Sequence, residues 1–413
     1  MKSYEVLIVG GGHGGAQTAI ALRQAQIKGS IAIVSLETDP PYERPPLSKD
    51  YLKGEKGFER LLIRPIRFWG DRDISLLLGQ RVVAVDPNTK TVTTEQGERI
   101  NYGVLVWAAG GVPRSLTCEG SDLLGIHSLR NRADIDQLVS ELPKVKRVVV
   151  IGGGYIGLEA ASALTSLGKE VVVVEASDRV LARVAGEPLS RFYESRHRSH
   201  GVDIRLSNAV ASIQGQDGRV SGVRLADGEF LTAQLIVVGI GIEPAVGPLL
   251  AAGALGENGV KVDSFCRTTL PEVFAIGDCA LHINDFSGGE EIRLESVQNA
   301  VDMANVVAKT IAGKPEGYKV VPWFWSNQFG LKLQTVGLSR GYDSIVVRRN
   351  RSVDSLSMIY LKNGVVIALD CVNSVKDYVQ GRGLVVARCE RSVEVLADVS
   401  KSLKEIGLNE AND

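Results

Sequence analysis

The chain has 413 residues, more than an ordinary single domain, which predicts two or three domains. It contains 45 glycines but only 14 prolines and no triplet repeat, so a collagen-like or low-complexity chain is excluded. Charged residues make up 23% and hydrophobic residues 44%, as in folded globular proteins. With 47 basic and 48 acidic residues the net charge is −1, which argues against a protein that binds nucleic acid through bulk positive charge.

The N-terminal residues give no sign of a targeting signal. Residues 1–5 run directly into the apolar segment 6–9 and a glycine cluster, without the apolar core and cleavage site of a signal peptide. The most apolar segments, 148–158 and 235–242, are shorter than the roughly 18 residues that a membrane span needs. The five cysteines lie far apart and form no C-x-x-C pair. We therefore expect a cytoplasmic protein whose cysteines are mainly small core residues.

An internal repeat organises the first part of the chain. Residues 6–15 (VLIVGGGHGG) recur 142 positions later as residues 148–157 (VVVIGGGYIG). Each copy consists of a β-branched strand, the motif G-x-G-x-x-G, an Ala-rich predicted helix and a second predicted strand. These helices are expected at 16–24 and 158–167, and the second strands at 31–36 and 171–174. Each copy is thus a predicted βαβ unit, and the chain is predicted to be an α/β protein with two Rossmann-like domains.

Within each repeat the three motif glycines have separate expected tasks. The first permits a tight turn, the second lets the backbone approach a pyrophosphate, and the third lets the helix pack on the strand, with helix N–H groups facing the anion. These glycines are Gly10, Gly12 and Gly15 in the first copy and Gly152, Gly154 and Gly157 in the second. A glycine-rich turn without a ligand is the alternative for a single copy, but two matched copies favour two dinucleotide sites.

Each dinucleotide site also needs an acid near the end of its second strand to accept the ribose hydroxyls. In the second copy this acid is Glu175, which favours NAD over NADP, although Arg179 nearby points the other way. In the first copy it is Glu37, with Leu36 immediately before it. The ribose contact of the first copy is therefore assigned to Glu37 or Leu36.

Three further predicted strands, 104–111, 235–241 and 273–278, end in small residues. The last one ends in Gly277-Asp278, where a carboxylate would accept a ribityl hydroxyl of a flavin; an ordinary strand-terminal turn is the alternative. A helix is expected at 296–312, with its apolar residues on one face. Two dinucleotide sites in one chain are most economically explained by resident FAD with NADH as its hydride donor.

From about residue 320 the sequence becomes rich in β-strand patterns and predicts a third domain of α+β type. A hairpin is expected at 359–372, turning at Asn363-Gly364, the pair that a type I′ turn prefers. Further strands are predicted at 331–338 and 344–349, and short helices near 375–380 and 393–404.

Five segments of the chain are together more specific than the glycine motifs: R-P-P-L-S-K (44–49), G-G-G-Y-I-G-L-E (152–159), A-I-G-D-C-A (275–280), E-S-V-Q-N-A (295–300) and P-W-F-W-S-N-Q (322–328). Together they resemble one family, the NADH-dependent ferredoxin reductases of oxygenase systems, to which putidaredoxin reductase and biphenyl dioxygenase reductase belong. The resemblance spans nearly the whole chain and keeps the order of the motifs. It implies a glutathione-reductase-like flavoprotein with an FAD domain at 1–112 and 245–319, an inserted NAD domain at 113–244, and a C-terminal interface domain at 320–413.

The resemblance also assigns residues to the two cofactors. For FAD it implies Gly10, Gly12, Gly14, Gly15, Leu36 or Glu37, Arg44, Lys49, Val82, Ala109, Arg130, Gly277, Asp278 and Val297, with Trp323 or Trp325 near the ring system. For NAD it implies Gly152, Gly154, Tyr155, Ile156, Gly157, Glu159, Glu175 and Gly241.

Lys49 and Glu159 are the predicted catalytic residues. A cation near the flavin would stabilise the negative charge of its reduced form, and Glu159 would pair with Lys49 and steer the nicotinamide. Pro45-Pro46 is expected to hold Lys49 through an extended backbone. The alternatives are a solvated surface lysine and an acid that favours the first turn of a helix.

The absence of a cysteine pair decides the expected reaction. Disulfide reductases of this fold need a C-x-x-C or C-x-x-x-x-C pair at the flavin, and segment 42–49, where the larger ones keep it, has no cysteine. Cys279 is expected to be a small buried residue. We therefore predict an NADH:ferredoxin reductase that passes single electrons to a [2Fe-2S] ferredoxin supplying an aromatic-ring dioxygenase or a cytochrome P450. The alternatives are an apoptosis-inducing-factor-like flavoprotein that acts by binding partners, and an NADH oxidase or peroxidase.

Two further segments are basic. His197 and His200 have a spacing that suits a metal ion on a helix, but no third ligand is evident, so a solvated basic face is expected and no metal site is predicted. Arg348, Arg349 and Arg351 form a basic run that would attract an acidic ferredoxin; an exposed hairpin end is the alternative.

Overall fold

The computed structural model describes residues 2–349 and 354–408. These residues form two compact units. Unit 1 comprises Met1–Arg44, Gly57–Val112 and Ile242–Pro322, and unit 2 comprises Pro45–Lys56, Pro113–Gly241 and Trp323–Asp413. Within the described ranges, no helix is both long enough and apolar enough to cross a membrane.

Unit 1 is built around a sheet with the strand order β3-β2-β1-β6, extended by β19 beside β6. These five strands run parallel, and the hairpin β4-β5 joins β6 in antiparallel orientation. The strands are β1 (Lys2–Val9), β2 (Ile31–Val34), β3 (Ile74–Leu77), β4 (Val82–Asp86), β5 (Thr91–Thr94), β6 (Arg99–Trp107) and β19 (Val273–Ala275). Because β1 lies between β2 and β6, the chain reverses the direction of strand addition at the carboxyl end of β1, the position at which such sheets bind ligands.

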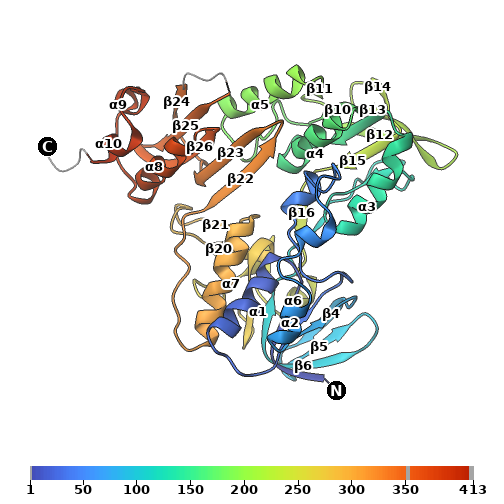
Figure 1. Ribbon diagram of the computed structural model, residues 1–413, viewed down its shortest axis with the longest axis vertical. Coiled ribbons are helices and arrows are strands. Elements are labelled where there is room, and N and C mark those ends of the chain that lie inside the picture. The colour runs from blue at the N-terminus through green and yellow to red at the C-terminus, as the bar shows by residue number, and fades with distance from the viewer. Residues whose placement is uncertain (1, 350–353, 409–413) are drawn as a thin grey trace. The chain divides into compact units, whose positions relative to one another are not determined.

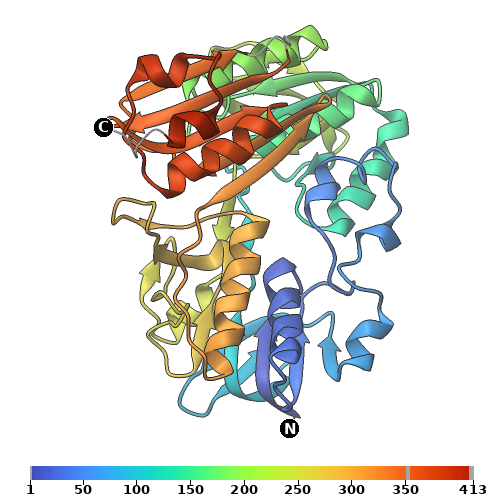
Figure 2. The same ribbon diagram turned by 60° about the vertical axis from the view of Figure 1, so that its left-hand side comes forward.

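Side-chain alternation gives this sheet two cores. Val6 and Ile8 of β1 and Ile31 and Ile33 of β2 pack with α1 (His13–Gln24) and α7 (Val297–Ile311). The alternate residues Leu7, Val9, Ala32 and Val34 pack with β4, β5 and α6 (Gly247–Ala251) in a second buried cluster. Helices α1 and α7 run side by side in both ribbon views (Figures 1 and 2). Both faces of the second half of β1, residues 6–9, are thus buried, which explains the unbroken apolar sequence of that half.

Smaller elements complete unit 1. They are α2 (Arg67–Asp71), the 3-10 turns η2 (Phe58–Leu61) and η4 (Gly277–Cys279), and a four-stranded sheet of β17 (Gly256–Glu257), β18 (Gly259–Lys261), β20 (Ala280–Ile283) and β21 (Glu291–Ile292). The chain leaves the unit along β7 (Gly111–Pro113) and returns along β16 (Ile242–Pro244).

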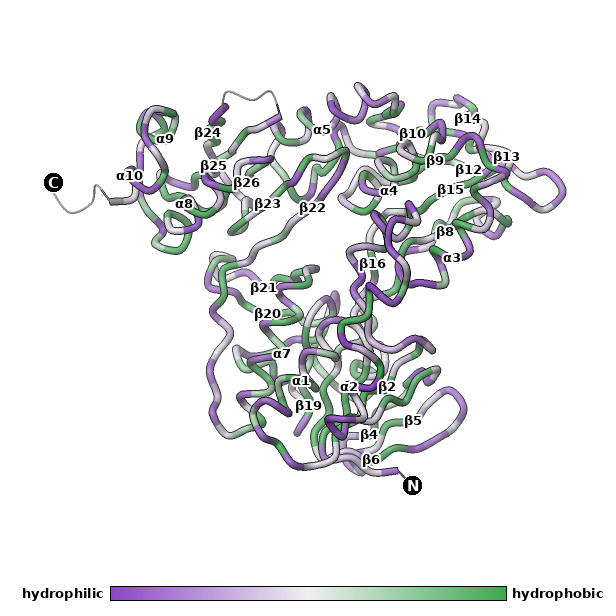
Figure 3. The backbone as a smooth tube through the Cα atoms, viewed as in Figure 1, coloured by the Kyte–Doolittle hydropathy of each residue, from purple (hydrophilic) through white to green (hydrophobic). Residues whose placement is uncertain are grey.

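Unit 2 contains the second parallel sheet, with the order β11-β10-β9-β15-β8. Its strands are β8 (Ile126–His127), β9 (Arg147–Ile151), β10 (Glu170–Val174), β11 (Asp203–Arg205) and β15 (Leu235–Val238). The helical elements are α3 (Arg132–Glu141), η3 (Leu142–Lys144), α4 (Tyr155–Ser166) and α5 (Glu187–Ser199). A three-stranded antiparallel sheet follows, made of β12 (Val210–Gln216), β13 (Arg219–Leu225) and β14 (Phe230–Thr232). Hydrophobic residues follow the parallel strands, whereas the turn from β12 to β13 is hydrophilic (Figure 3).

The C-terminal part of unit 2 is a five-stranded antiparallel sheet with the order β22-β23-β26-β25-β24. The strands are β22 (Trp323–Gln328), β23 (Leu331–Gly337), β24 (Ser344–Arg349), β25 (Leu356–Lys362) and β26 (Val365–Val372), and the helices α8 (Val375–Val386), α9 (Val393–Ala397) and α10 (Leu403–Leu408). The predicted hairpin is confirmed, with Asn363 and Gly364 both at positive φ. Helix α8 is six residues longer than the predicted segment 375–380.

The predicted fold class is therefore confirmed: two Rossmann-like parallel sheets and a C-terminal α+β region. The compact units place residues 113–241 and 323–413 together, so the division of the chain into three domains remains a proposal.

Candidate functional site: two dinucleotide turns and a buried Lys-Glu pair

The first glycine turn joins β1 to α1 in unit 1. Gly10 has a φ of +116°, and a Cβ atom there would lie 2.2 Å from the carbonyl oxygen of Ala108. A Cβ atom on Gly15 would lie 1.9 Å from the carbonyl oxygen of Gly10. By contrast, a Cβ atom on Gly12 would meet no described atom within 4 Å. The fold thus requires glycine at positions 10 and 15, whereas Gly12 borders open space.

The second turn, between β9 and α4 in unit 2, has the same pattern. Gly152 has a φ of +106°, and its Cβ atom would lie 2.5 Å from the carbonyl oxygen of Gly239. A Cβ atom on Gly157 would lie 2.0 Å from the carbonyl oxygen of Gly152, but one on Gly154 would come no closer than 4.0 Å to a described atom. Both middle glycines are explained by a ligand whose phosphates approach the backbone.

The helix N-termini at both turns suit an anion. Gly12 is the N-cap of α1 and Gly154 the N-cap of α4, and neither helix receives a capping hydrogen bond from an N-cap side chain. The amide groups of each first turn therefore point their partial positive charge toward the open space at the middle glycine. Two turns with this geometry fit the pyrophosphates of two dinucleotides.

The contrast between the middle and the last glycine gives a direct test. We expect Gly154→Ala to leave the melting temperature almost unchanged and to weaken NAD⁺ binding at least tenfold, because the added methyl enters the ligand's space. Gly157→Ala, which collides with backbone, should destabilise the fold by several kcal/mol. Differential scanning calorimetry and NAD⁺ titration distinguish the two variants; equal losses of stability would contradict this assignment.

In unit 1 the predicted acid Glu37 belongs to a polar cluster just after β2. Its carboxylate accepts a hydrogen bond of 2.5 Å from the Tyr42 hydroxyl and forms an ion pair with Arg44. The Arg44 guanidinium also lies 4.8 Å from the centre of the Tyr42 ring. Leu36, in contrast, is 60% exposed, because β2 ends at Val34 and not at the predicted residue 36. Of the two alternatives, Glu37 is the residue that the structure places in a polar cluster.

Asp278 is electrostatically linked to this cluster. Burial disfavours the charged form of Arg44, but Tyr42, Glu37 and Asp278 together raise the pKa of its guanidinium above the usual value. Asp278 lies in η4, directly after β19, and follows Gly277, whose φ of +72° favours glycine. Three predicted FAD residues, Glu37, Arg44 and Asp278, are therefore neighbours in unit 1.

The other predicted FAD residues of unit 1 have varied surroundings. Ala109 is half-buried after the end of β6, and Val297 is the half-buried first residue of α7, whose N-cap Ser296 accepts a hydrogen bond of 3.1 Å from the Asn299 amide. Val82 is buried in the core at the start of β4. Gly14 is buried, and a Cβ atom there would lie 3.2 Å from Ile276, so Gly14 permits close packing of α1. Their contacts with FAD stay predictions.

In unit 2 Glu175 lies directly after β10 and is held at the second glycine turn. Its Oε2 accepts a hydrogen bond of 2.7 Å from the Gly153 amide, and its Oε1 accepts one of 2.7 Å from the Ser177 amide. Each carboxylate oxygen has a second lone pair, so the group retains acceptor capacity for ribose hydroxyls. The predicted NAD residues Tyr155 and Ile156 occupy the first turn of α4, with Ile156 exposed. Gly241 has a φ of +100° beyond β15.

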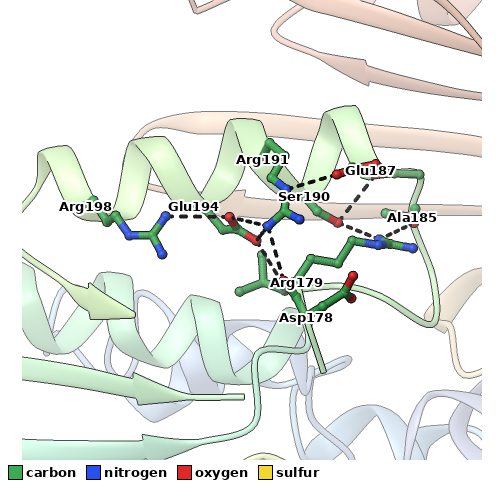
Figure 4. A network of polar contacts seen from close by, with 10 residues as sticks. Asp178, Arg179, Ala185, Glu187, Ser190, Arg191, Glu194 and Arg198 are labelled. Atoms are coloured by element: carbon green, nitrogen blue, oxygen red, sulfur yellow. Dashed lines mark hydrogen bonds and ion pairs between the residues drawn. The ribbon is translucent and has the colours of Figure 1, made fainter. Parts of the chain in front are cut away.

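Arg179, whose place in the sequence favoured NADP, donates its hydrogen bonds to the loop before α5 and to α5 itself. Its Nη1 donates hydrogen bonds to the Ala185 carbonyl (2.8 Å) and to Ser190 Oγ (2.7 Å), and its Nη2 donates to the Ala182 carbonyl (3.0 Å). Figure 4 shows this arginine turned toward α5, below a second network in which Arg191 and Arg198 contact the buried Glu194. Arg179 thus stabilises the loop before α5. Because its guanidinium is used there, the structure weakens the argument that Arg179 binds the 2′-phosphate of NADP.

This difference predicts how the two residues control coenzyme choice. We expect Glu175→Ala to lower kcat/KM for NADH by about tenfold to a hundredfold, the scale of lost bidentate hydrogen bonds, and to reduce the preference over NADPH. Arg179→Ala, the matched control, should lower the melting temperature without changing the NADH to NADPH ratio. If Arg179→Ala altered that ratio and Glu175→Ala did not, the assignment would be wrong.

Lys49 and Glu159 form a buried ion pair within unit 2. Lys49 Nζ lies 2.5 Å from Glu159 Oε2 and donates a hydrogen bond of 3.1 Å to the Pro45 carbonyl. The Lys49 side chain is 14% exposed and the Glu159 side chain 2%. The expected pairing is present, and the alternative of a solvated surface lysine is excluded. Its catalytic role stays a prediction.

The segment before Lys49 differs from expectation. Pro45 and Pro46 begin the 3-10 turn η1 (Pro45–Ser48) and do not form an extended segment. The fixed φ of proline suits a 3-10 turn as well as an extended chain, so the pattern alone does not separate the two. The turn closes with a hydrogen bond of 3.0 Å from the Lys49 amide to the Pro46 carbonyl, which directs Lys49 back over the prolines.

Two serines at this pair were missed by the sequence analysis. Ser48 donates a hydrogen bond of 2.7 Å to Glu159 Oε2, and Ser326 donates one of 2.6 Å to Glu159 Oε1. Both lie in segments that carried the family resemblance, 44–49 and 322–328, and both adjoin residues that were assigned. The side-chain alternation of a strand at 322–328 is the signal that places Ser326 on the opposite face from Trp323 and Trp325.

The remaining predicted FAD residues, Arg130, Trp323 and Trp325, also lie in unit 2. Trp323 and Trp325 are both half-buried on one face of β22, with their ring centres 5.4 Å apart. Arg130 precedes α3, and its amide donates a hydrogen bond of 2.9 Å to Asp134 in the capping box of that helix. That these residues and Lys49 contact FAD stays a prediction.

The thiol chemistry expected from the sequence agrees with the structure. All five cysteines, each within the described ranges, are free, and Cys266, Cys279, Cys371 and Cys389 are buried. Burial raises the pKa of the Cys279 thiol to about 12, so this residue is protonated at neutral pH and is a poor nucleophile. The part of the chain that the structure describes also contains no group of three or more His, Cys, Asp or Glu residues suited to a metal ion.

Two expectations about basic residues are wrong. His197 is not part of a solvated face: it is fully buried on α5, and burial lowers its pKa to about 4. Arg348 is only 4% exposed, because it donates hydrogen bonds to the carbonyls of Leu396, Asp398 and Lys401. Arg348 thus ties β24 to the C-terminal segment and cannot dock a ferredoxin. Arg349 is exposed, and Arg351 lies outside the described residues.

Two family models together match most of the chain. The model of the pyridine nucleotide-disulphide oxidoreductase family matches residues 4–304, and that of the reductase C-terminal domain matches residues 323–407. The chain belongs to the pyridine nucleotide-disulphide oxidoreductase family. Within that family its relatives include ferredoxin reductases, as the resemblance indicated, and also rubredoxin-NAD(+) reductases, and it is an oxidoreductase of this flavin- and nicotinamide-dependent type.

Three of these relatives are similar over nearly their whole length. The 5,5'-dehydrodivanillate O-demethylase ferredoxin reductase subunit of Sphingobium sp. (strain NBRC 103272 / SYK-6) is 54% identical over 98% of this chain and 99% of its own. A ferredoxin--NAD(P)(+) reductase of Sphingomonas sp. is 58% identical over 93% of both chains. The reductase in the crystal structure of the covalent putidaredoxin reductase-putidaredoxin complex is 35% identical, with a TM-score of 0.93 and 98% of each chain covered.

Proposed function

We propose that this oxidoreductase takes electrons from NADH onto FAD and delivers them singly to a [2Fe-2S] ferredoxin that supplies an oxygenase. The observation that carries the proposal is the pair of matched glycine turns, each with open space at its middle glycine, in a chain whose cysteines are free and mostly buried. Two dinucleotides can then exchange electrons, while a protein dithiol is not available to receive them. An external acceptor is the simplest exit.

We assign FAD to the turn at Gly12 and NADH to the turn at Gly154. In unit 1 the cluster of Glu37, Arg44 and Asp278 supplies both a carboxylate for ribose and a charged environment beside the turn. FAD, when bound, accepts a hydride and releases electrons one at a time. In unit 2 Glu175 accepts hydrogen bonds from ribose hydroxyls of NADH. Its carboxylate is already oriented by the Gly153 and Ser177 amides.

The Lys49-Glu159 pair supplies the electrostatic component of the proposal. A cation that a buried carboxylate holds in place costs little reorganisation when negative charge develops nearby. Lys49 is such a cation, because Glu159 and the Pro45 carbonyl both hold its ammonium group. We propose that Lys49 stabilises the reduced flavin and that Glu159 orients Lys49 and the nicotinamide.

The acceptor is assigned from two kinds of support. Relatives of the chain include the 5,5'-dehydrodivanillate O-demethylase ferredoxin reductase subunit and the reductase of the covalent putidaredoxin reductase-putidaredoxin complex. On this chain, exposed Arg349 remains a candidate contact for an acidic ferredoxin, whereas Arg348 does not. We also propose the cytoplasm as its compartment, where NADH is available and thiols remain reduced.

Rapid mixing under anaerobic conditions tests the proposal. We expect NADH to bleach the absorbance of the bound flavin, and the reduced protein to transfer electrons to an oxidised [2Fe-2S] ferredoxin in a second mixing step. Dioxygen and a rubredoxin serve as competing acceptors. If dioxygen or the rubredoxin reoxidised the flavin faster than every ferredoxin tested, the ferredoxin reductase assignment would be refuted.

A further inference from the structure

Strand β22 packs against helix α4 through one face of each element. Phe324, Ser326 and Gln328 alternate along β22 and so share a face. On α4, Tyr155, Glu159 and Ser162 lie about one helical turn apart and share a face as well. The Phe324 and Tyr155 rings are 4.7 Å apart, and at the other end of this interface the Phe329 amide donates a hydrogen bond of 2.8 Å to Ser162 Oγ.

A chain of three hydrogen bonds runs from His197 to Glu159 between these contacts. His197 Nε2 lies 2.9 Å from Gln328 Oε1, Gln328 Nε2 lies 3.1 Å from Ser326 Oγ, and Ser326 Oγ lies 2.6 Å from Glu159 Oε1. All four residues are buried, with whole-residue exposures of 0%, 2%, 0% and 3% from His197 to Glu159. Such a chain is sequestered from bulk water, so each member depends on the others for its hydrogen bonds.

The donor and the acceptor of each of these three hydrogen bonds can be assigned. The Gln328 amide group donates to Ser326 Oγ, so its carbonyl oxygen faces His197 and must accept a proton from Nε2. Ser326 accepts from Gln328 and therefore has its own proton free to donate to Glu159. His197 Nε2 consequently carries a proton; because burial lowers the pKa of His197 to about 4, the ring is neutral at pH 7 and is the Nε2–H tautomer. Bonds that all point the same way polarise one another and strengthen the last one.

We propose that Ser326, Gln328 and His197 are positioning residues for the Lys49-Glu159 pair. Glu159 Oε2 is used by Lys49 and Ser48, and Oε1 is used by Ser326. These hydrogen bonds thus fix the Glu159 carboxylate in one orientation, with Lys49 at Oε2 and Ser326 of the C-terminal sheet at Oε1. This inference rests on the proposed function for its kinetic consequence, but the positioning itself concerns this chain's own residues.

β22 therefore does more than pack against α4, because it also supplies the hydrogen bond of Ser326 to the Glu159 carboxylate. A buried carboxylate with one unsatisfied oxygen is costly, and it relieves that cost by rotating or by taking up a proton. Either change would release Lys49 from its present partner. The C-terminal sheet therefore contributes to the reductive step through Ser326, although neither Gln328 nor His197 touches Lys49 or Glu159.

Chemical labelling of Lys49 tests the positioning without using turnover. We expect Ser326→Ala to increase the rate of reductive methylation of Lys49, measured by mass spectrometry of the holoprotein, by about tenfold, the lower end of the scale of one lost hydrogen bond to a charged group. Labelling of Lys53, the internal reference, should not change. The matched control is Ser357→Ala, which removes an equally buried serine of the same sheet, one that donates a hydrogen bond of 2.7 Å to Asp377. Equal labelling of Lys49 in both variants would overturn the proposal.

A double-mutant cycle on flavin reduction by NADH tests the kinetic consequence. Ser326→Ala should slow flavin reduction about tenfold, Ser326→Thr should restore the rate because it keeps the hydroxyl, and Ser357→Ala should have no effect. In a Glu159→Gln background, Ser326→Ala should add no further loss. Independent, multiplying losses would refute the route through Glu159. If NADH failed to reduce the flavin of the unmodified protein, the proposed function would fail, and the labelling result would still decide the positioning.

Discussion

Close approach of two backbone segments at the end of the first strand of each βαβ unit is the constraint on which this structure depends. Gly10 faces the Ala108 carbonyl and Gly152 faces the Gly239 carbonyl at distances that no side chain permits. The same turns bring Gly15 and Gly157 onto the carbonyls of Gly10 and Gly152, so each helix begins directly over its strand. This compactness aims helix amides at one point, and it leaves the middle glycine of each turn beside open space. The excess of glycine in the composition is thus partly a requirement of the backbone and partly a requirement of the ligands.

In unit 2, several polar side chains lie near the second glycine turn. Glu175 binds the Gly153 amide and keeps acceptor capacity for a ribose, while Arg179 serves the loop that leads into α5. Glu159, four residues beyond Tyr155, is buried and receives Lys49 and two serines. One helix, α4, therefore carries both the amides that we assign to a pyrophosphate and the carboxylate that holds the nearby cation.

Patterns that reflect local geometry were predicted well from the sequence. The paired βαβ units, the Asn363-Gly364 hairpin and helix α7 follow from periodicity and turn chemistry, and the structure confirms them. Features that depend on long-range packing were not predicted. His197 and Arg348 look like solvated charges in sequence, but α5 packs against β22 and β24 packs against the C-terminal segment, so both are buried. Ser326 contacts Glu159 across 167 positions of sequence, and a contact of that kind depends on sheet register, which local patterns do not report.

The central claim is that the two matched turns hold two different dinucleotides in one chain. Its most direct test is the nucleotide stoichiometry of the purified protein, from quantitative extraction of bound flavin combined with calorimetric titration of NAD⁺. The account predicts one FAD retained per chain and one additional site for NAD⁺ that does not compete with it. Protein that retained no FAD after reconstitution, or NAD⁺ that displaced the flavin, would contradict the account.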